Sequence, residues 1–541
     1  MRLSAVFLTL AQFFLPPAII GTVYLYSYPA IQQCSFPVAK RAEAACHFDG
    51  SNKPAIPAET APFRLLAFGD PQLEGDTSLP AEFAKGYFPS LKDGFWHGVQ
   101  QCGDKERVWC GIRPALVGLL TQDVPRVLQS YRKKVDLWGN DLYLAHVYWL
   151  VSWWAQPTHM VVLGDLLGSQ WIGDDEFKRR SERLWGKVFK GAEKVPREVT
   201  DVSGRVEVLG RDERWARRLI AVAGNHDIGY AGDVDEHRIE RFEETYGRVN
   251  WEVRFRLNDS SEAAAHSPSL FGSPSSLAKT PPELRLVILN SMNLDEPAFK
   301  PELRQQSLDF LANRLQTSDG HSTDNSATVL LTHIPLHKEA GVCADAPFFS
   351  YFSAHEGGGI KEQNHLSEEM SQYILDGLLG VADQGTGTGS AIVLNGHDHE
   401  GCDTFHYRSN NIIPGETVDE AAEPDHHRAW QAEQFENSLP HRTDSDTAGM
   451  REITVRSMMG SYGGNAGMLS AWFDDDEGQW KFEYSACRLG VQHIWWGVHG
   501  FDLFVFGLAV AGVVMAVWEE VGSARAEAER EGKVGPKAKK A

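Results

Sequence analysis

The sequence predicts an α/β fold with a membrane-spanning segment near each end. Short runs rich in valine, isoleucine and leucine recur along the middle of the chain, and most of them stop at glycine followed by a polar residue. Such runs are typical of buried strands. The stretches between them, for example 177–190 and 305–315, have helical periodicity. The expected strands cover 63–68, 159–163, 219–223, 284–289, 329–332 and 391–395.

The composition excludes several functional classes. The chain has 541 residues, with 52 Lys plus Arg against 73 Asp plus Glu and a formal net charge of -21. Proteins that bind nucleic acid need a basic surface, so no nucleic-acid partner is expected. Seven cysteines are too few for a disulfide scaffold in a chain of this length. In an oxidising compartment Cys102 could pair with Cys110, or Cys34 with Cys46.

Both ends of the chain are apolar enough to cross a bilayer. Residues 3–39 carry no charge, and 6–28 are mostly apolar, which suffices for a span. We interpret residues 1–30 as a membrane anchor, with a cleaved signal peptide as the alternative, because only Arg2 is charged and Pro29 disfavours cleavage. Near the other end, 503–518 are uncharged and follow Trp495 and Trp496, which predicts a transmembrane helix over 494–518. A buried core helix is the alternative there.

The last residues predict a compartment and an orientation. Lys537 and Lys539 resemble the dilysine signal that a coat-type receptor in the cytosol reads to retrieve membrane proteins to the endoplasmic reticulum. A cytosolic tail over 519–541 then puts residues 31–60, as a linker, and the domain after them in the lumen. Asn258, in the sequon Asn258-Asp259-Ser260, is a predicted glycosylation site there. A solvated basic end without a signal is the alternative.

Polar residues follow five of the expected strands. In chain order they are Asp70, Asp165, Asn225 with His226, His333, and His397 with His399. Open α/β sheets bind ligands at the carboxyl ends of their strands. Carboxylate, amide and imidazole ligands without thiolate suit manganese, iron or zinc. A carboxylate that bridges two such cations, about 3.5–4 Å apart, is typical of sites that activate water for attack on phosphorus.

These residues stand in motifs that resemble the calcineurin-like metallophosphoesterases over residues 61–487. The matching motifs are Gly69-Asp70-Pro71-Gln72, Gly164-Asp165, Gly224-Asn225-His226-Asp227, Thr332-His333 and Gly396-His397-Asp398-His399. The resemblance implies a β-sandwich flanked by helices (αββα) over 61–488. Within it, residues 409–450 are polar with little periodicity, which predicts an inserted loop that is exposed or partly disordered. The resemblance also implies two divalent metal ions, with manganese expected and zinc or iron as alternatives.

The resemblance assigns a role to each site residue. By that likeness Asp70, Gln72, Asp165 and His399 hold the first metal, and Asp165, Asn225, His333 and His397 hold the second. His226 is expected to protonate the leaving oxygen. The sequence departs from the family pattern at Gln72, where histidine is usual, and an amide oxygen is a weaker ligand. It also has Gly168 where protein phosphatases carry an aspartate that orients the acid histidine.

A narrower resemblance is to the fungal Ted-type and Cdc-type proteins. It rests on the residues after Asp70 (Pro-Gln-Leu-Glu-Gly), on 137–141 (Leu-Trp-Gly-Asn-Asp) and on the segments 456–460 and 463–467. Those proteins are phosphoesterases of the endoplasmic reticulum membrane that remove ethanolamine phosphate from a mannose of GPI anchors. The resemblance implies a GPI lipid or GPI-anchored protein as substrate and a role in the exit of such proteins to the Golgi. Another lumenal phosphoesterase, or a non-catalytic escort with the same fold, is the alternative.

Overall fold

The computed structural model describes most of the chain as two compact units. The described residues are 2–38, 60–75, 88–101, 107–202, 204–257, 281–319, 325–343, 346–379, 390–409, 430–442 and 447–533. One unit consists of Met1–Gln33 with Leu489–Ala541, and the other of Cys34–Arg488.

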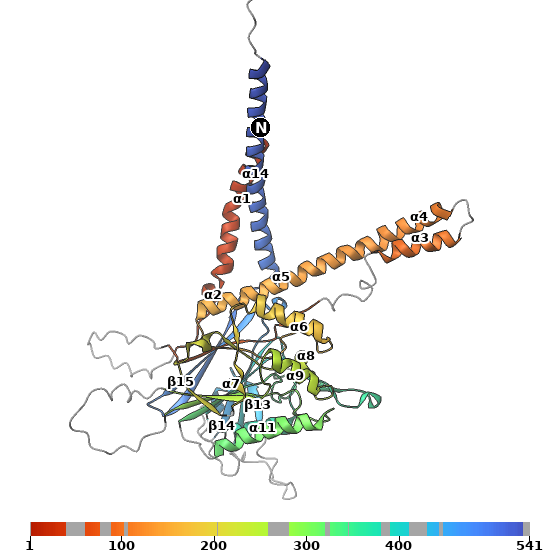
Figure 1. Cartoon of the computed structure of the whole chain (residues 1–541). Coiled ribbons are helices and arrows are strands. Elements are labelled where there is room, and N and C mark those ends of the chain that lie inside the picture. The colour runs from red at the N-terminus through yellow and green to blue at the C-terminus, as the bar shows by residue number, and fades with distance from the viewer. Residues whose placement is uncertain are drawn as a thin grey trace, which may run out of the picture. The chain divides into compact units, whose positions relative to one another are not determined.

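The smaller unit is a pair of long apolar helices. Helix α1 (Leu3–Tyr26) is followed by the short α2 (Tyr28–Ile31), and α14 covers Gln492–Lys533. The two long helices pack along one another, and the Thr22 hydroxyl donates to Asp502 at 2.8 Å. Both are long and apolar enough to cross a membrane, over Leu3–Tyr26 and Gln492–Ala528 (Figure 1). They coincide with the two predicted spans, and α14 continues as helix into the predicted tail.

The larger unit contains two main sheets. The six-stranded sheet has the order β16 (Gln479–Arg488), β15 (Asn465–Asp474), β1 (Phe63–Phe68), β2 (His159–Val162), β5 (Arg218–Ala221) and β3 (Glu193–Lys194). The eight-stranded sheet has the order β13 (Gln431–Gln434), β12 (Cys402–Ser409), β14 (Thr447–Thr454), β11 (Ser390–Asn395), β8 (Ser326–Leu331), β7 (Glu283–Ile288), β6 (Trp251–Arg256) and β4 (Arg205–Val208). A hairpin pairs β9 (Phe349–Tyr351) with β10 (Ile360–Gln363).

The two sheets pack face to face through alternate residues of their strands. Leu65 and Ala67 of β1 share one buried cluster with Leu284 and Leu286 of β7, because successive side chains of a strand point to opposite faces. On its other face β1 presents Phe68, whose ring lies 5.9 Å from that of Tyr148 in a covering helix. The predicted sandwich between helix layers is therefore confirmed.

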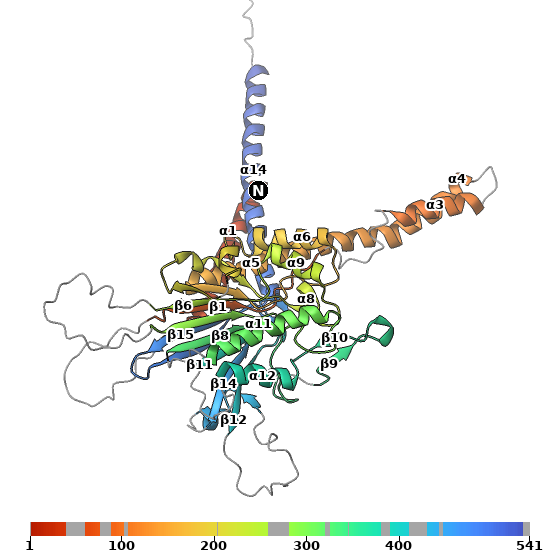
Figure 2. The same ribbon diagram turned by 60° about the horizontal axis from the view of Figure 1, so that its bottom comes forward.

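Helices cover the outer faces of both sheets. Figure 2 shows α5 (Val124–Ala155), α6 (Asp174–Arg183) and α9 (Glu236–Thr245) on one side, and α11 (Pro301–Asp319) with α12 (Glu368–Leu379) on the other. The remaining helical segments are α3 (Pro89–Gln101), α4 (Arg107–Gly118), the π-turns η3 (Leu119–Asp123) and η4 (Leu184–Val188), α7 (Arg197–Thr200), η5 (Glu213–Ala216), α8 (Asn225–Ile228), η6 (Ala354–Glu356), α13 (Leu439–Arg442) and η8 (Gly460–Tyr462).

The predicted strands are all present, but one segment that is predicted to be irregular contains regular structure. The six expected runs are β1, β2, β5, β7, β8 and β11, with ends shifted by a few residues. Residues 409–450 were expected to form an insertion without regular structure. Within their described part, Gln431–Gln434 form β13 and Leu439–Arg442 form α13. β13 pairs with β12, which provides hydrogen-bond partners for its backbone. The weak periodicity of this segment gives no sign of that pairing.

The disulfides also differ from expectation. Cys34 pairs with Cys487 of β16, so its predicted pairing with Cys46 is wrong. Cys343 pairs with Cys402 of β12. A disulfide needs Cα atoms close in space, and those of Cys34 and Cys487 lie 5.1 Å apart despite a sequence separation of 453. The predicted pairing of Cys102 with Cys110 lies outside the described residues.

Candidate metal centre

The predicted ligands meet at one edge of the sandwich. Asp70, Asp165 and Asn225 follow β1, β2 and β5, while His333 and His397 follow β8 and β11 of the other sheet. Two groups of side chains have their ligand atoms within 4.8 Å of one another: Asp165, His333 and His397 form one, and Asp70, Asp165 and His399 form the other. Asp165 belongs to both groups, as a bridging carboxylate would.

In the first group, the histidine nitrogens that face the other ligand atoms carry no hydrogen when the rings are neutral. His333 donates its Nδ1–H to the Leu163 carbonyl at 2.6 Å, and His397 donates its Nε2–H to the Gln363 carbonyl at 2.8 Å. The opposite nitrogens of both rings, which are then acceptors, each lie 3.1 Å from Asn225 Oδ1. His333 Nε2 also lies 3.4 Å from Asp165 Oδ1. Imidazole nitrogens and an amide oxygen that converge at this distance form an arrangement that a shared cation would satisfy.

Next to the second group lies Gln72, the departure from the family pattern. Its side-chain amide lies 3.0 Å from Asp165 Oδ2 and 3.0 Å from His399 Nε2. The amide group can turn to present its oxygen, so Gln72 occupies the position of a ligand. His399 Nδ1 lies 3.2 Å from the Tyr462 hydroxyl, which orients the ring.

The backbone of the site is held in an unusual conformation. Asp70, Gln72, Asp165 and His397 have positive φ angles of 41°, 41°, 49° and 72°. Left-handed conformations of residues other than glycine cost free energy and concentrate at functional sites. Gly224 allows a close approach, because a Cβ there would lie 2.2 Å from the Asp165 backbone nitrogen.

The electrostatics favour divalent cations. Burial raises the pKa of Asp70, and the charge of Asp165 raises it further. For Asp165, burial opposes ionisation, but His333 and His226 bring its pKa below the ordinary value. Burial lowers the pKa of His397 to about 3, so its imidazole is neutral, as metal ligation requires. Buried carboxylates next to neutral imidazoles fit two divalent metal ions.

His226 lies beside the shared carboxylate. Its backbone N–H donates to Asp165 Oδ1 at 2.8 Å, and its Nε2 lies 3.7 Å from Asp165 Oδ2. Its Nδ1 is buried and has no hydrogen-bond partner among the described residues. This agrees with glycine at 168, where protein phosphatases carry the orienting aspartate. The ring thus presents Nε2 to the ligand cluster.

Two contacts of the centre are not predicted from the sequence. The carbonyl of Gln363 orients His397, and the hydroxyl of Tyr462 orients His399. A backbone carbonyl carries no signal in the side-chain pattern. Tyr462 lies between the segments 456–460 and 463–467 that carry the fungal-type resemblance, and neither segment includes it.

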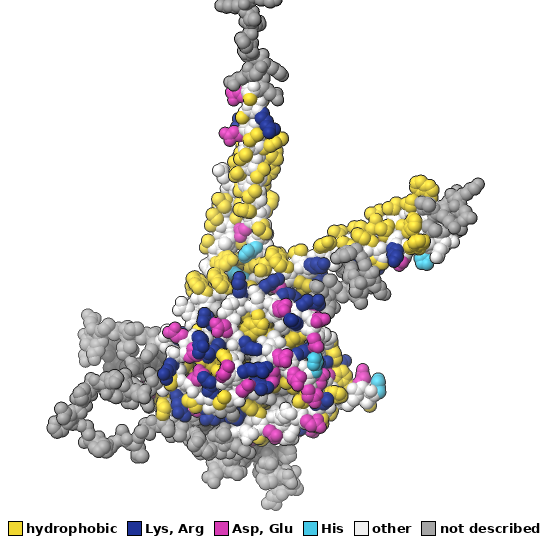
Figure 3. Space-filling model, viewed as in Figure 1, with side chains coloured by type: hydrophobic (Ala, Val, Ile, Leu, Met, Phe, Trp, Pro, Cys, Tyr) yellow, Lys and Arg dark blue, Asp and Glu magenta, His cyan; other side chains and the backbone are white. Residues whose placement is uncertain are grey.

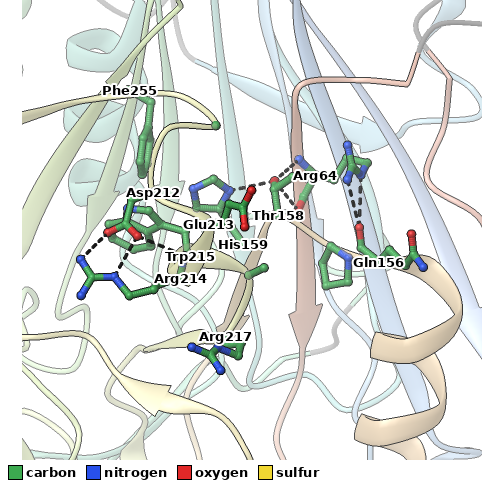
Figure 4. A pocket seen from close by; sticks show the side chains of 13 residues that line it. Arg64, Gln156, Thr158, His159, Asp212, Glu213, Arg214, Trp215, Arg217 and Phe255 are labelled. Atoms are coloured by element: carbon green, nitrogen blue, oxygen red, sulfur yellow. Dashed lines mark hydrogen bonds and ion pairs between the residues drawn. The ribbon is translucent and has the colours of Figure 1, made fainter.

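A separate cavity lies at the opposite edge of the sandwich. It has a volume of about 590 Å³ and is lined by Arg64, Thr158, His159, Trp215 and Phe255, among others (Figure 4). Thr158 and His159 lie at the beginning of β2, whereas Asp165 follows its end. The cavity is therefore distinct from the metal centre. The predicted Asn258, Lys537 and Lys539 lie outside the described residues.

Comparison with known proteins finds several relatives of this chain. No protein-family model matches the chain. Protein TED1 of Saccharomyces cerevisiae is 27% identical over 531 residues, which cover 88% of this chain and 92% of TED1. An uncharacterized protein of Schizosaccharomyces pombe is 26% identical, over 68% of this chain and 79% of that protein. Metallophosphoesterase 1 of Cricetulus griseus is 23% identical, over 54% of this chain and 63% of its own length.

The sandwich, the ligand cluster and these relatives together support a metal-dependent phosphoester hydrolase that is similar to the metallophosphoesterases. Within that class it is related to the fungal Ted1 proteins.

Proposed function

We propose that this chain is a two-metal phosphodiesterase of the endoplasmic reticulum lumen that removes ethanolamine phosphate from a mannose of GPI anchors. The observation that carries the reaction class is the pair of ligand groups that share Asp165. The substrate class is supported by the resemblance of the segments around Gln72, Asp141 and Ser457 to the fungal Ted-type and Cdc-type proteins.

We assign Asp70, Gln72, Asp165 and His399 to the first metal and Asp165, Asn225, His333 and His397 to the second. Manganese is the proposed ion, with zinc or iron as alternatives. When bound, the two ions supply positive charge at the phosphate and an activated water.

His226 is the proposed general acid. Water adds to phosphorus, the bond from phosphorus to the mannose oxygen breaks, and His226 Nε2 gives that oxygen its proton. The products are ethanolamine phosphate and a free mannose hydroxyl. Because His226 Nδ1 has no hydrogen-bond partner among the described residues, the ring must be positioned mainly by its backbone contact to Asp165.

The location follows from the ends of the chain. We propose that α1 and α14 anchor it in the endoplasmic reticulum membrane, with residues 31–60 as a lumenal linker and 61–488 as the catalytic domain. Lys537 and Lys539 of the tail, 519–541, would bind a coat-type retrieval receptor, and Asn258 would carry a glycan. In the lumen, the proposed partner is a GPI lipid or a GPI-anchored protein on its way to the Golgi.

Two measurements test this function. Mass spectrometry of GPI glycans from cells that lack the chain should show ethanolamine phosphate retained on one mannose, and wild-type protein but not Asp165→Asn should remove it. The purified full-length protein should hydrolyse bis(p-nitrophenyl) phosphate with manganese added. Rescue of the glycan by the Asp165→Asn variant, without hydrolysis in vitro, would instead support a non-catalytic escort.

A further inference from the structure

Helix α5 has an exposed apolar side opposite the one that joins the core. On the core side Leu144, Val147 and Val151 are fully buried. On the other side lie six large side chains that are three, four or eleven residues apart. These intervals place them along one stripe of the helix. These residues, called the α5 face below, are between 51% and 64% exposed: Leu128, Tyr131, Val135, Trp138, Trp149 and Trp153.

An apolar stripe of this length is unusual for a surface exposed to water. A helix on the outside of a globular domain normally has polar residues on its solvent side. Here residues 142–155 contain no charged residue. Figure 3 shows hydrophobic side chains continuing along the helices from α3 to α5. Four of the six residues of the α5 face are aromatic with a polar atom, and tryptophan and tyrosine concentrate where a bilayer meets water.

The chain ties the end of α5 to both membrane helices. The indole N–H of Trp154 donates to the carbonyl of Cys34 at 2.8 Å. Cys34 comes eight residues after Tyr26, the last residue of α1, and is bonded to Cys487, five residues before α14 begins at Gln492. Short tethers raise the local concentration of the bilayer at α5, so a weak lipid affinity suffices for contact.

A basic groove borders the α5 face. It has a volume of about 200 Å³, and Trp138 lines it together with Lys134, Arg179, Arg183, Lys187 and two acidic residues. The acids are Asp141, 2.6 Å from Arg183, and Glu176, which pairs with Arg179. Four cations against two carboxylates leave an excess of positive charge. Aromatic residues beside basic ones are typical of helices that lie in a membrane interface and contact lipid phosphates.

We propose that the α5 face lies in the headgroup layer of the bilayer that α1 and α14 cross, with a lipid phosphate in the groove beside Trp138. This contact would hold the metallophosphoesterase unit against the lipid surface from which a membrane-linked substrate comes. The inference depends on the membrane anchors and not on the proposed substrate.

Depth-dependent quenching in the full chain tests the contact. Val135→Cys and Trp153→Cys, each labelled with the environment-sensitive fluorophore NBD, are compared in phosphatidylcholine vesicles with Phe299→Cys and Tyr351→Cys. The control positions carry equally exposed hydrophobic side chains, at 55% and 54%, outside α5. The unsubstituted protein serves as the labelling blank, and hydrolysis of bis(p-nitrophenyl) phosphate reports that each variant is folded.

Lipids with a quencher near the headgroup should lower emission at positions 135 and 153 about twofold or more, and leave the two controls nearly unchanged. A fraction of anionic phosphatidylinositol should strengthen the quenching, and Lys134→Glu should weaken that increase. Equal quenching at all four positions would overturn the proposal. So would an unquenched label at position 135 that forms crosslinks between two molecules, since a second copy of the chain would then cover the face.

Discussion

Asp165 is the residue on which the metal centre depends most. It is 1% exposed, it belongs to both groups of ligands, and it accepts the backbone N–H that positions His226. A single carboxylate therefore links the proposed metal binding to the placement of the proposed acid. An asparagine has nearly the same shape but no charge and only one oxygen to offer.

We expect Asp165→Asn to lose nearly all activity and to bind less metal. The fold should persist, because the core of the sandwich is formed by apolar residues of other positions. Turnover of bis(p-nitrophenyl) phosphate, metal content by mass spectrometry and the thermal midpoint measure the three effects. Normal turnover with two ions still bound would remove the assignment of a shared ligand.

His226→Ala should separate catalysis from metal binding. His226 belongs to neither of the ligand groups found among the described residues, so metal content should stay near that of the wild type. Turnover should fall by about 10²–10⁴-fold, the usual contribution of a general acid. A substrate whose leaving group needs no proton, such as one with a p-nitrophenolate, should lose less than an alkyl phosphodiester. An equal loss on both substrates would contradict the role as an acid.

Gln72→His tests the departure from the family pattern. The Gln72 amide lies 3.0 Å from His399 Nε2, where an imidazole would be a stronger ligand for zinc or iron than an amide oxygen. The variant should stay active and retain metal at chelator concentrations that strip the wild type. Faster metal loss from the variant would show that this position does not reach the first metal.

At the scale of elements, the sequence predicts what depends on local pattern. The six apolar runs become strands, and the ligands at their ends meet because the carboxyl ends of the parallel strands share an edge. Contacts that depend on distant partners are not predicted. Cys34 is bonded to Cys487, and β13 pairs with β12, because the arrangement of the sheets brings these partners together. Likewise, the carbonyl of Gln363 reaches His397 from a hairpin that no signal in the sequence connects to the site.

The beginning of β2 should make stability dependent on pH. His159 is buried, its ring stacks on Phe63 at 4.5 Å, and burial lowers its pKa to about 3. The unfolded chain takes up a proton near pH 6.5, whereas the folded chain does not. Neutral His159 therefore contributes to the free energy of unfolding above pH 6.5. This contribution is lost as the pH falls toward 3, by up to about 1.4 kcal/mol per pH unit.

His159→Phe should reduce this dependence. Between pH 7 and pH 5 the thermal midpoint of the variant should fall less than that of the wild type, since phenylalanine fits the same aromatic surroundings and takes up no proton. Some dependence should remain, because burial also lowers the pKa of His406. His355→Phe, at an exposed position, is the matched control and should behave as the wild type. An unchanged slope in His159→Phe would mean that this histidine is not the source.

At the scale of the whole molecule, the two segments that lead to α1 and α14 start from one covalent junction. The Cys34–Cys487 disulfide closes the larger unit at its two ends, next to the segments that lead to α1 and α14. Trp154 of α5 contacts the same junction. With α1 and α14 as the proposed anchors, the enzyme would have access to substrates in the bilayer, and its activity on them should depend on the proposed contact of α5 with lipid.

The variant Leu128→Ser/Val135→Ser/Trp153→Ser should therefore distinguish membrane substrates from soluble ones. Hydrolysis of bis(p-nitrophenyl) phosphate should be unchanged, because none of the three residues is among the ligands. Hydrolysis of the ethanolamine phosphate on a GPI-anchored protein in vesicles should fall about tenfold or more, since each large apolar side chain withdrawn from water contributes about 1.5–3 kcal/mol. Phe299→Ser/Tyr351→Ser removes exposed hydrophobic groups elsewhere and should change neither rate. A loss on both substrates would indicate damage to the fold, whereas full activity on vesicles would show that α5 does not bring the enzyme to its lipid-linked substrate.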